Sequence, residues 1–229
     1  EGIEGIKVSV FDANSTALSS SKILVNNSGS AATSQSFTLT TGVNENIGGS
    51  GNDTFDASTT ANSLNDFDNL DGAGGTDTVV AKTTTVADVA TSIAPVMKNI
   101  EVISITNTDS TAAGALDPND GDILTINLAE TTSIAKVVNV TSNDSVTFDN
   151  VNNLVELEVK SAQNDTTVNY NYAALAGAAD NMLITVKGTN GTDISIDDDN
   201  PLDTSVIETV TINSQSVANT IDSLDLSKV

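Results

Sequence analysis

The sequence contains no cysteine, histidine, tryptophan or arginine, and these absences exclude several classes of function. Without cysteine and histidine, the chain lacks the side chains of Ser-His-Asp and Cys-His catalysis. It also lacks the thiolate and imidazole ligands of zinc, iron–sulfur and haem sites. Because no disulfide can form, bound metal ions are the alternative means of stabilising the fold.

Positive charge and aromatic side chains are also scarce. The chain has 8 basic residues, all lysine, against 31 acidic residues, and its formal net charge is −23 over 229 residues. A chain this acidic repels phosphate backbones and anionic membranes, so we expect no nucleic-acid partner. No apolar run approaches the roughly 18–20 residues of a membrane span. Carboxylate pairs can hydrolyse glycosides, but only 3% of the residues are aromatic, so we predict that the chain is not an enzyme.

The abundant residues indicate an all-β fold. Aspartate outnumbers glutamate by 23 to 8, and Asp and Asn favour turns. Short alternating or β-branched runs recur, separated by Asn, Asp and Gly. The predicted strands are Ile6–Phe11, Ser36–Thr40, Glu101–Thr106, Ile123–Leu128, Lys136–Thr141, Ser145–Phe148, Leu154–Val159, Thr166–Tyr170, Met182–Val186, Thr192–Ile196 and Thr209–Ile212.

A weak internal repeat indicates a modular, stacked architecture. An apolar residue followed by glutamate precedes an alternating run at Glu101, Glu156 and Glu208, which are 55 and 52 residues apart. Acidic residues flanking strands in an acidic protein are the simpler explanation. Composition divides the chain into residues 1–36 (a strand and a Ser/Asn-rich linker), 37–106 (the glycine-rich module) and 107–229 (a strand-rich body, continuous with the module).

The strongest local motif spans residues 48–56, which read GGSGNDTFD. It fits the nonapeptide pattern G-G-x-G-x-D-x-U-x at every fixed position, where U is a large apolar residue. Glycines allow the backbone to turn tightly so that carbonyl oxygens converge, and Asp53 adds a carboxylate. Calcium takes about 6–8 oxygen ligands in a tolerant geometry, whereas magnesium requires a stricter octahedron. The motif therefore predicts a calcium-binding loop.

An imperfect second copy spans residues 72–79 and reads GAGGTDTV. It keeps Asp77 and the following apolar residue, but Ala73 replaces the second glycine. Gly72 follows Gly48 by 24 residues, whereas facing loops of an uninterrupted roll of nonapeptides are about 18 residues apart. The segment 57–65 must therefore be accommodated as an inserted loop.

Residues 37–106 resemble the calcium-binding module of type I-secreted bacterial S-layer proteins and their RTX-like surface relatives. The matching segments are 37–42 (FTLTTG), 52–55 (NDTF), 68–70 (DNL), 72–77 (GAGGTD) and 99–101 (NIE). Their order and spacing both match, whereas the strands beyond residue 106 match in style only. The resemblance implies an elongated β-solenoid-like or β-roll-like body, many bound calcium ions and a role in a two-dimensional surface lattice. A β-sandwich is the alternative for residues 107–229.

By position, the resemblance implies that Asp53, Asp68 and Asp77 are carboxylate ligands. Asn44 stands where such modules often have aspartate, so any ligand there is neutral and weaker, and Ala73 is expected to strain or widen the second loop. The candidate metal-binding residues of the module are Asp53, Asp77, Asp68, Asp71, Asn52, Asp56, Gly48, Gly49, Gly51, Gly72, Gly75 and Asn44.

Two further acidic clusters are weaker candidates. Residues 117–122 resemble a calcium loop but do not have EF-hand spacing. Residues 197–203 hold four carboxylates, whose mutual repulsion a cation would relieve. An exposed acidic loop is the simpler explanation for both. The candidate ligands in these clusters are Asp117, Asn119, Asp122, Asp197 and Asp199.

We therefore predict an extracellular, calcium-dependent structural protein of a bacterial cell-surface lattice. Calcium neutralises the repelling loops, so that metal binding drives folding and self-assembly. The expected partners are calcium, further copies of the chain and a cell-surface polysaccharide contacted through parts outside this chain. The chain begins at Glu1 without a signal-like segment, and we interpret it as an excised fragment or mature product.

Two alternatives remain open at this stage. The first is a domain of a large RTX-type adhesin that binds a surface or a glycan. The second is an acidic halophilic surface protein, whose charge serves solubility in salt. The intact nonapeptide argues against the second alternative, because calcium would then be incidental.

Overall fold

The computed structural model describes residues 5–11, 17–24, 32–86, 89–109, 123–177, 179–199, 206–215 and 218–226. The chain forms two compact units, residues 1–33 and 34–229. In the first unit, β1 (Gly5–Phe11) pairs antiparallel with β2 (Ala17–Leu24). The first of these strands was predicted.

The strand β2 corrects one expectation. It lies within the Ser/Asn-rich stretch that composition indicates as a linker, yet it pairs with β1 from Gly5↔Leu24 to Phe11↔Ala17. Strand formation depends more on cross-strand pairing than on the intrinsic preference of serine-rich residues. Residues 17–24 are therefore strand, and the linker that composition indicated is shorter.

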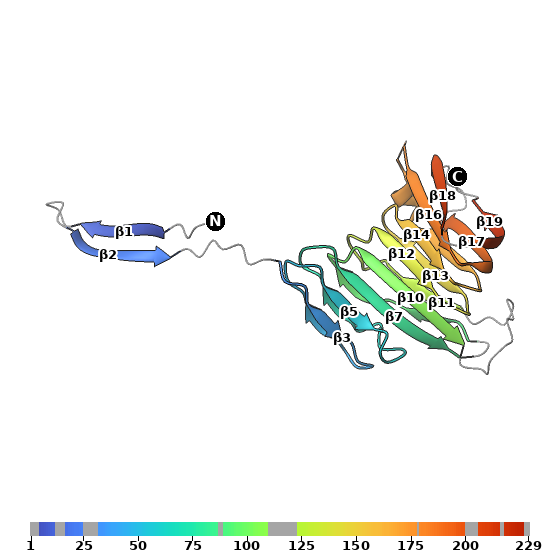
Figure 1. Ribbon diagram of the computed structural model, residues 1–229, viewed down its shortest axis with the longest axis horizontal. Coiled ribbons are helices and arrows are strands. Elements are labelled where there is room, and N and C mark those ends of the chain that lie inside the picture. The colour runs from blue at the N-terminus through green and yellow to red at the C-terminus, as the bar shows by residue number, and fades with distance from the viewer. Residues whose placement is uncertain are drawn as a thin grey trace. The chain divides into compact units, whose positions relative to one another are not determined.

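The second unit is built from parallel sheets of short strands (Figure 1). An eight-stranded sheet contains, in spatial order, β18 (Thr209–Gln215), β16 (Asn181–Lys187), β14 (Glu156–Lys160), β12 (Lys136–Val140), β10 (Val102–Asp109), β7 (Thr78–Thr85), β5 (Thr54–Ala57) and β3 (Ser36–Thr38). A six-stranded sheet contains β19 (Thr220–Asp225), β17 (Asn190–Asp198), β15 (Thr166–Tyr170), β13 (Val146–Val151), β11 (Leu124–Asn127) and β8 (Thr91–Ile93). A three-stranded sheet contains β4 (Glu45–Ile47), β6 (Asn69–Asp71) and β9 (Val96–Lys98).

Successive strands alternate between sheets, so the chain winds in coils. From β10 to β19, every strand of the eight-stranded sheet is followed by one of the six-stranded sheet. All pairings in the three sheets are parallel. This solenoid-like arrangement confirms the predicted all-β class. The same two sheets continue through residues 123–226, which therefore do not form a separate antiparallel sandwich.

The coil also explains the weak sequence repeat. Glu101 immediately precedes β10, Glu156 opens β14 and Glu208 immediately precedes β18. These are alternate strands of the eight-stranded sheet, because β12 and β16 lie between them. The repeat of about 50 residues therefore corresponds to two coils. The expected boundary between residues 106 and 107 falls inside β10, whose eight residues all pair with β7.

The interior is held by apolar residues stacked in register. One row crosses the whole eight-stranded sheet, one residue from each strand, and these residues are Phe37, Phe55, Val79, Ile103, Val137, Leu157, Ile184 and Ile212. Ile212, in the edge strand, is the exposed end of this row. The rings of Phe37 and Phe55 stack with centroids 5.1 Å apart. Inward residues of the six-stranded sheet, such as Phe148 and Val168, complete the buried core. Phe55, the apolar residue of the first motif, is fully buried.

The described part of the chain contains little helical structure. The 3-10 turn Tyr172–Leu175 is the only helix in the described part of the chain. Over that part, no helix has both the length and the apolar character needed to cross a membrane.

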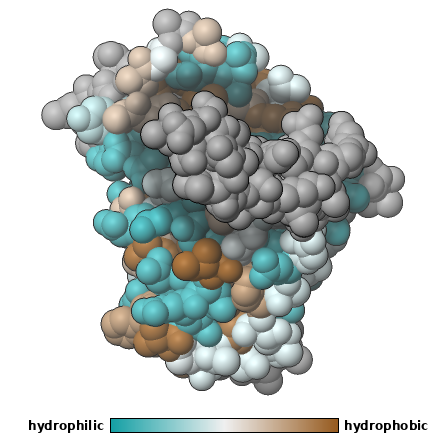
Figure 2. Space-filling model, turned by 90° about the vertical axis from the view of Figure 1, so that its left-hand side faces the viewer, coloured by the Kyte–Doolittle hydropathy of each residue, from teal (hydrophilic) through white to brown (hydrophobic). Residues whose placement is uncertain are grey.

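Figure 2 shows apolar surface as separate brown patches among hydrophilic teal. Exposed apolar residues include Val43, Ile47 and Phe67.

Candidate functional site

The two glycine motifs form loops that stack one coil apart. The first loop lies between β4 and β5, and the second between β6 and β7. Strand pairing aligns Ile47 with Asp71 and Thr54 with Thr78, so corresponding loop residues are 24 apart. The Gly74 N–H donates to the carbonyl of Gly49 at 2.9 Å. The loops are therefore hydrogen-bonded to one another as well as to their own strands.

Acidic side chains link successive coils. The Asp53 carboxylate accepts hydrogen bonds from the N–H groups of Gln35 and Gly49, both at 2.6 Å. The Asp53 N–H donates to Oδ1 of Asp77 at 2.6 Å, and the Asp77 N–H donates to Oε2 of Glu101 at 2.7 Å. We call Asp53, Asp77 and Glu101 the acid ladder. Each member accepts a hydrogen bond from a backbone N–H of the preceding coil, and this N–H takes no part in the hydrogen bonds between the strands.

Asp77 is the least satisfied member of the acid ladder. Its side chain is 0% exposed, and no hydrogen-bond donor contacts its Oδ2 atom. Burial raises the pKa of Asp77 above its ordinary value, the hydrogen bond from Asp53 opposes this, and the nearby carboxylates of Asp53, Glu101 and Asp71 raise it further. A buried carboxylate oxygen without a donor is unfavourable unless it protonates or binds a cation.

The two loops differ at the residue after their first glycine, and this difference accompanies the missing donor at Asp77. In the first loop, Gly49 N–H donates to Oδ2 of Asp53. The corresponding residue in the second loop is Ala73, whose N–H donates instead to Oδ1 of Asp71 at 2.9 Å. Ala73 has a φ of 63°, in the left-handed region that disfavours a side chain. The second loop is strained at Ala73, as the sequence predicted.

Glycine is required where the backbone passes the carboxylates. A Cβ on Gly48 would overlap with the Asp53 carboxylate and the carbonyl oxygen of Gly72. A Cβ on Gly72 would overlap with Oδ2 of Asp77 and the carbonyl oxygen of Asn99. Beside each of these two glycines, a carboxylate oxygen and a carbonyl oxygen of the next coil thus lie on the same side. These are hard oxygen donors of the kind that calcium uses.

The remaining motif glycines shape the same loops. Gly75 has a φ of 130°, and a Cβ there would overlap with the carbonyl of Gly51. Asn52, which lies between Gly51 and Asp53, accepts a hydrogen bond from Thr76 N–H through Oδ1 at 3.0 Å. These contacts hold the two loops in register, so the backbone conformation of each loop depends on the other.

Asp68 and Asn44 form a second column, separate from the acid ladder in their contacts. Asp68 is 0% exposed, and its Oδ1 accepts hydrogen bonds from the N–H and Nδ2 of Asn44, at 2.9 and 2.8 Å. Its Oδ2 accepts from Asn65 N–H at 2.9 Å. Burial raises the pKa of Asp68, although these hydrogen bonds oppose the shift. The side chain of Asn44 therefore acts as a donor to Asp68, a role that the carboxylate of an aspartate at position 44 could not fill.

Asp71 and Asp56 stabilise turns at the surface. Hydrogen bonds from the Asn99 side chain and from Ala73 N–H lower the pKa of Asp71. Hydrogen bonds from the side chain and backbone of Ser58 lower the pKa of Asp56. Both carboxylates are therefore already stabilised in their charged form by the protein itself.

The weaker candidates are not part of these loops. Oδ1 of Asp197 accepts from Asp198 N–H at 2.8 Å, and Oδ1 of Asp199 accepts from Tyr172 N–H at 3.0 Å. Asp117, Asn119 and Asp122 lie outside the described residues. Over the residues that are described, no three acidic side chains are grouped closely enough to form a metal site by themselves. A cation at Asp77 would therefore need carbonyl oxygens among its ligands.

Glu101 was missed as a site residue. The sequence identified it only as part of the apolar–Glu repeat, although Asp53, Asp77 and Glu101 are spaced by 24 residues. Glu208, from the same repeat, accepts from Asp180 N–H at 2.6 Å. The equal spacing of these acidic residues, each directly before a strand, was therefore the signal that could have identified Glu101 as a site residue.

Comparison with known proteins gives no relative: no protein-family model, no curated protein and no solved structure matches the chain.

Proposed function

We propose that the chain is a calcium-dependent structural protein of a bacterial cell-surface lattice, in which calcium bound at the stacked glycine loops stabilises the coil and permits self-assembly. The observation that carries this proposal is the buried Oδ2 atom of Asp77. It has no hydrogen-bond donor, and it lies on the same side of Gly72 as the carbonyl oxygen of Asn99.

Charge supports a cation at this place. The acid ladder stacks three carboxylates at the same corner of successive coils, with two lysines in residues 34–106 against nine acidic residues in the same span. Calcium would supply positive charge where the chain has little of its own. Asp77 and the Asn99 carbonyl would hold it, with Glu101 and Asp53 within reach of its field.

The cation would act as a folding ligand. Because the loops exist only when coils are stacked, calcium would bind the folded chain and not the unfolded one. Its stabilisation then grows with concentration, by about 2.7 kcal/mol when calcium is at 100 times its dissociation constant. Extracellular calcium would therefore favour the folded, assembling form, and this supports the proposed structural role outside the cell.

The test is a calcium titration from EGTA, followed by far-UV circular dichroism and light scattering, with magnesium as the control ion. We expect β structure and assembly to increase with calcium only. Asp77→Asn should abolish most of the calcium response. Asp56→Asn, which removes the same charge from a surface turn, should leave it intact.

Each other result has a definite meaning. If calcium changes neither signal, the proposed function is wrong. If calcium orders a chain that stays monomeric, a lattice role is wrong and the RTX-type adhesin becomes the better proposal. If Asp56→Asn loses as much of the response as Asp77→Asn, binding is a property of net charge rather than of the glycine loops.

A further inference from the structure

The lysines are distributed unequally between the two large sheets. Four of the eight lysines in the chain lie in strands of the eight-stranded sheet, and none lies in a strand of the six-stranded sheet. These four are Lys82 in β7, Lys136 in β12, Lys160 in β14 and Lys187 in β16. In a chain of net charge −23, the outer side of one sheet therefore carries an unusual share of the positive charge.

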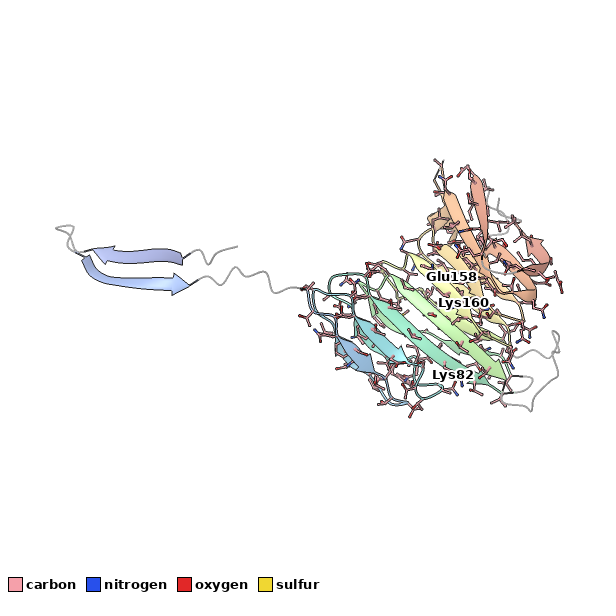
Figure 3. The ribbon with its side chains drawn as sticks, in the orientation of Figure 1. Lys82, Glu158 and Lys160 are labelled. Carbon is pink, nitrogen blue, oxygen red and sulfur yellow. The ribbon has the colours of Figure 1, made fainter. Side chains whose placement is uncertain are left out.

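Three of these lysines share one row across the sheet, which we call the lysine row: Lys82, Lys160 and Lys187. Strand pairing aligns Lys82 with Thr106, and Lys160 with Lys187. Their neighbours along the strands, Val159 and Val186, point into the core, so the lysines point outward. Figure 3 shows Lys82 and Lys160 along this sheet.

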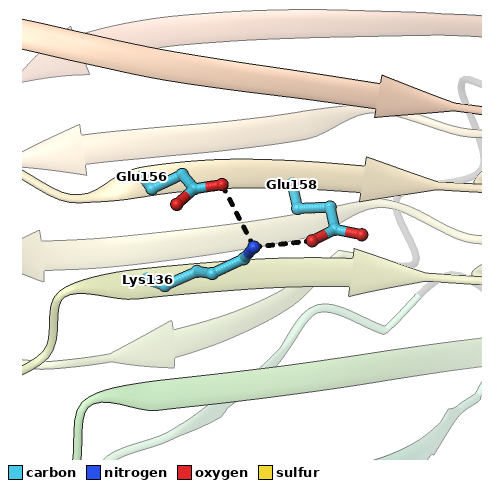
Figure 4. A network of polar contacts seen from close by, with 3 residues as sticks. All are labelled: Lys136, Glu156 and Glu158. Carbon is cyan, nitrogen blue, oxygen red and sulfur yellow. Dashed lines mark hydrogen bonds and ion pairs between the residues drawn. The ribbon is translucent and has the colours of Figure 1, made fainter. Parts of the chain in front are cut away.

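The fourth lysine already has partners. Lys136 Nζ lies 3.1 Å from Oε1 of Glu156 and 2.7 Å from Oε2 of Glu158 (Figure 4). These are the only ion pairs within the described residues, and neither includes the lysine row. Lys160 and Lys187 stand on neighbouring strands about 4.8 Å apart, so their charges repel unless an anion lies between them.

The outer side of the six-stranded sheet is acidic and hollowed. The lining of a cavity of about 390 Å³ on this side includes three carboxylates, those of Asp165, Asp193 and Asp222. We call this cavity the acidic hollow. Oδ1 of Asp193 is buried and has no hydrogen-bond partner. Burial raises the pKa of Asp165, and the charge of Asp193 raises it further. The hollow therefore favours a positively charged occupant.

The lysine row and the acidic hollow have the same spacing between their charged residues. Asp165 and Asp193 occupy neighbouring coils, since β15 and β17 pair with Thr166 opposite Ile194. Lys160 and Lys187 also occupy neighbouring coils, on β14 and β16. Both pairs therefore repeat at the same strand spacing of about 4.8 Å. No three carboxylates of the described residues are grouped closely enough to form a metal site by themselves, whereas lysine ammonium groups on long stems can reach a pair of carboxylates.

We propose that the lysine row of one copy docks on the acidic hollow of a second copy, with Lys160 and Lys187 facing Asp165 and Asp193. This inference rests on the proposed self-assembly and names the surfaces that carry it. Because the two surfaces lie on different sheets, the contact is heterologous and leaves one free surface of each kind on the pair. Copies would therefore add in open rows, and dimers would not be closed.

The test uses charge reversal in the full chain with saturating calcium. We expect Lys160→Glu with Lys187→Glu, and separately Asp165→Lys with Asp193→Lys, to reduce assembly at least tenfold in light scattering. Each variant then repels itself, but the two are complementary to one another. An equimolar mixture should therefore recover assembly. Lys7→Glu with Lys22→Glu, which makes the same charge change in the hairpin of β1 and β2, should assemble as the wild type does.

The results separate this inference from the proposed function. Wild-type chain that fails to assemble with calcium contradicts both. Wild type that assembles, with reversal variants that assemble equally well, contradicts the docking surfaces alone. Variants that retain the wild-type circular dichroism but do not recover on mixing also contradict it. If the lysine variants assemble normally and lose only retention on a sulfated dextran column, the lysine row binds a polyanion and our inference is wrong.

Discussion

The backbone N–H of Asp53 donates a 2.6 Å hydrogen bond to Oδ1 of Asp77, the residue that occupies the same position one coil later. Both motif aspartates thus contact the neighbouring coil, and Asp53 also contacts its own loop. Asp53 meets the Gly49 N–H with its second carboxylate oxygen, and Asp77 has no such donor. The two copies of the motif are therefore unequal, and under the proposed function an added cation would have the greater effect at the second.

The first prediction concerns Gly72. A Cβ there would overlap with the Asp77 carboxylate and the Asn99 carbonyl. We expect Gly72→Ala to lower the free energy of unfolding by about 1–3 kcal/mol through overpacking, and to weaken calcium binding. Urea unfolding with and without calcium measures both. Gly74→Ala is the matched control, since a Cβ there meets only ordinary contacts. Equal losses in the two variants would contradict the close approach at Gly72.

The second prediction concerns Ala73, which has a φ of 63°. Ala73→Gly removes the left-handed strain, which costs about 1–2 kcal/mol, but increases the freedom of the unfolded chain. We expect a net gain of up to about 1 kcal/mol in the free energy of unfolding. Ala176→Gly, at an ordinary φ of −78°, should instead lose stability. A loss at both positions would show that Ala73 is not strained.

The third prediction is a pH dependence of the calcium-free chain. Since the pKa of Asp77 is raised in the folded state, the folded chain holds this proton more tightly than the unfolded chain. The contribution of Asp77 is therefore most favourable below its ordinary pKa, and it is lost as pH rises through the raised pKa. The Asp77→Asn variant has no carboxylate at this position that could ionise. Its free energy of unfolding relative to that of wild type should therefore increase from about pH 4 upward.

Urea unfolding in EGTA at a series of pH values measures this difference. Saturating calcium should restore the wild type near neutral pH and leave Asp77→Asn almost unchanged. Asp56 is the opposite case, because its pKa is lowered in the folded chain. Asp56→Asn should lose stability relative to wild type above the ordinary pKa of aspartate, and that loss should disappear as pH falls. Parallel profiles for the two variants would contradict the assignment of Asp77.

The fourth prediction concerns the end of the acid ladder. Glu101→Ala leaves the Asp77 N–H without its acceptor. We expect a loss of about 1–3 kcal/mol in the free energy of unfolding, measured in calcium-saturated buffer. Glu130→Ala, at an exposed glutamate, should change stability by less than about 0.5 kcal/mol. If both substitutions are neutral, water replaces the carboxylate and the ladder does not stabilise the coil.

Sequence reasoning predicted the strands that have a clear alternating pattern. Every predicted strand overlaps an observed one, from Ile6–Phe11 in β1 to Thr209–Ile212 in β18. It missed the three-residue strands β4, β6, β8 and β9, because three residues cannot show a period of two. It also missed β2, β5, β19 and β7, the last of which begins at the end of the second glycine motif and ends in three threonines. Pairing with β5 and β10 on both sides stabilises this strand.

The candidate site was predicted only at the level of residue type. The pattern of glycine and aspartate located the loops, and the structure places both loops in one stack. The partners of each carboxylate depend on which coil lies beside it, and this is a property of the folded chain. Asp68 and Asp77 are alike in the sequence, yet donors contact both oxygens of Asp68 and only one oxygen of Asp77.

The apolar row from Phe37 to Ile212 keeps its register although the loops between its members differ in length. Residues 24 apart pair in β5 and β7, and residues 34 apart pair in β10 and β12. Within the sheet, each inner strand of the row pairs only with its two neighbours, and the edge strands β3 and β18 pair with one, as in repeat proteins. Tension applied along the chain would therefore detach one coil at a time, beginning at an edge such as β18. Such a molecule would extend in steps under load and rewind when released.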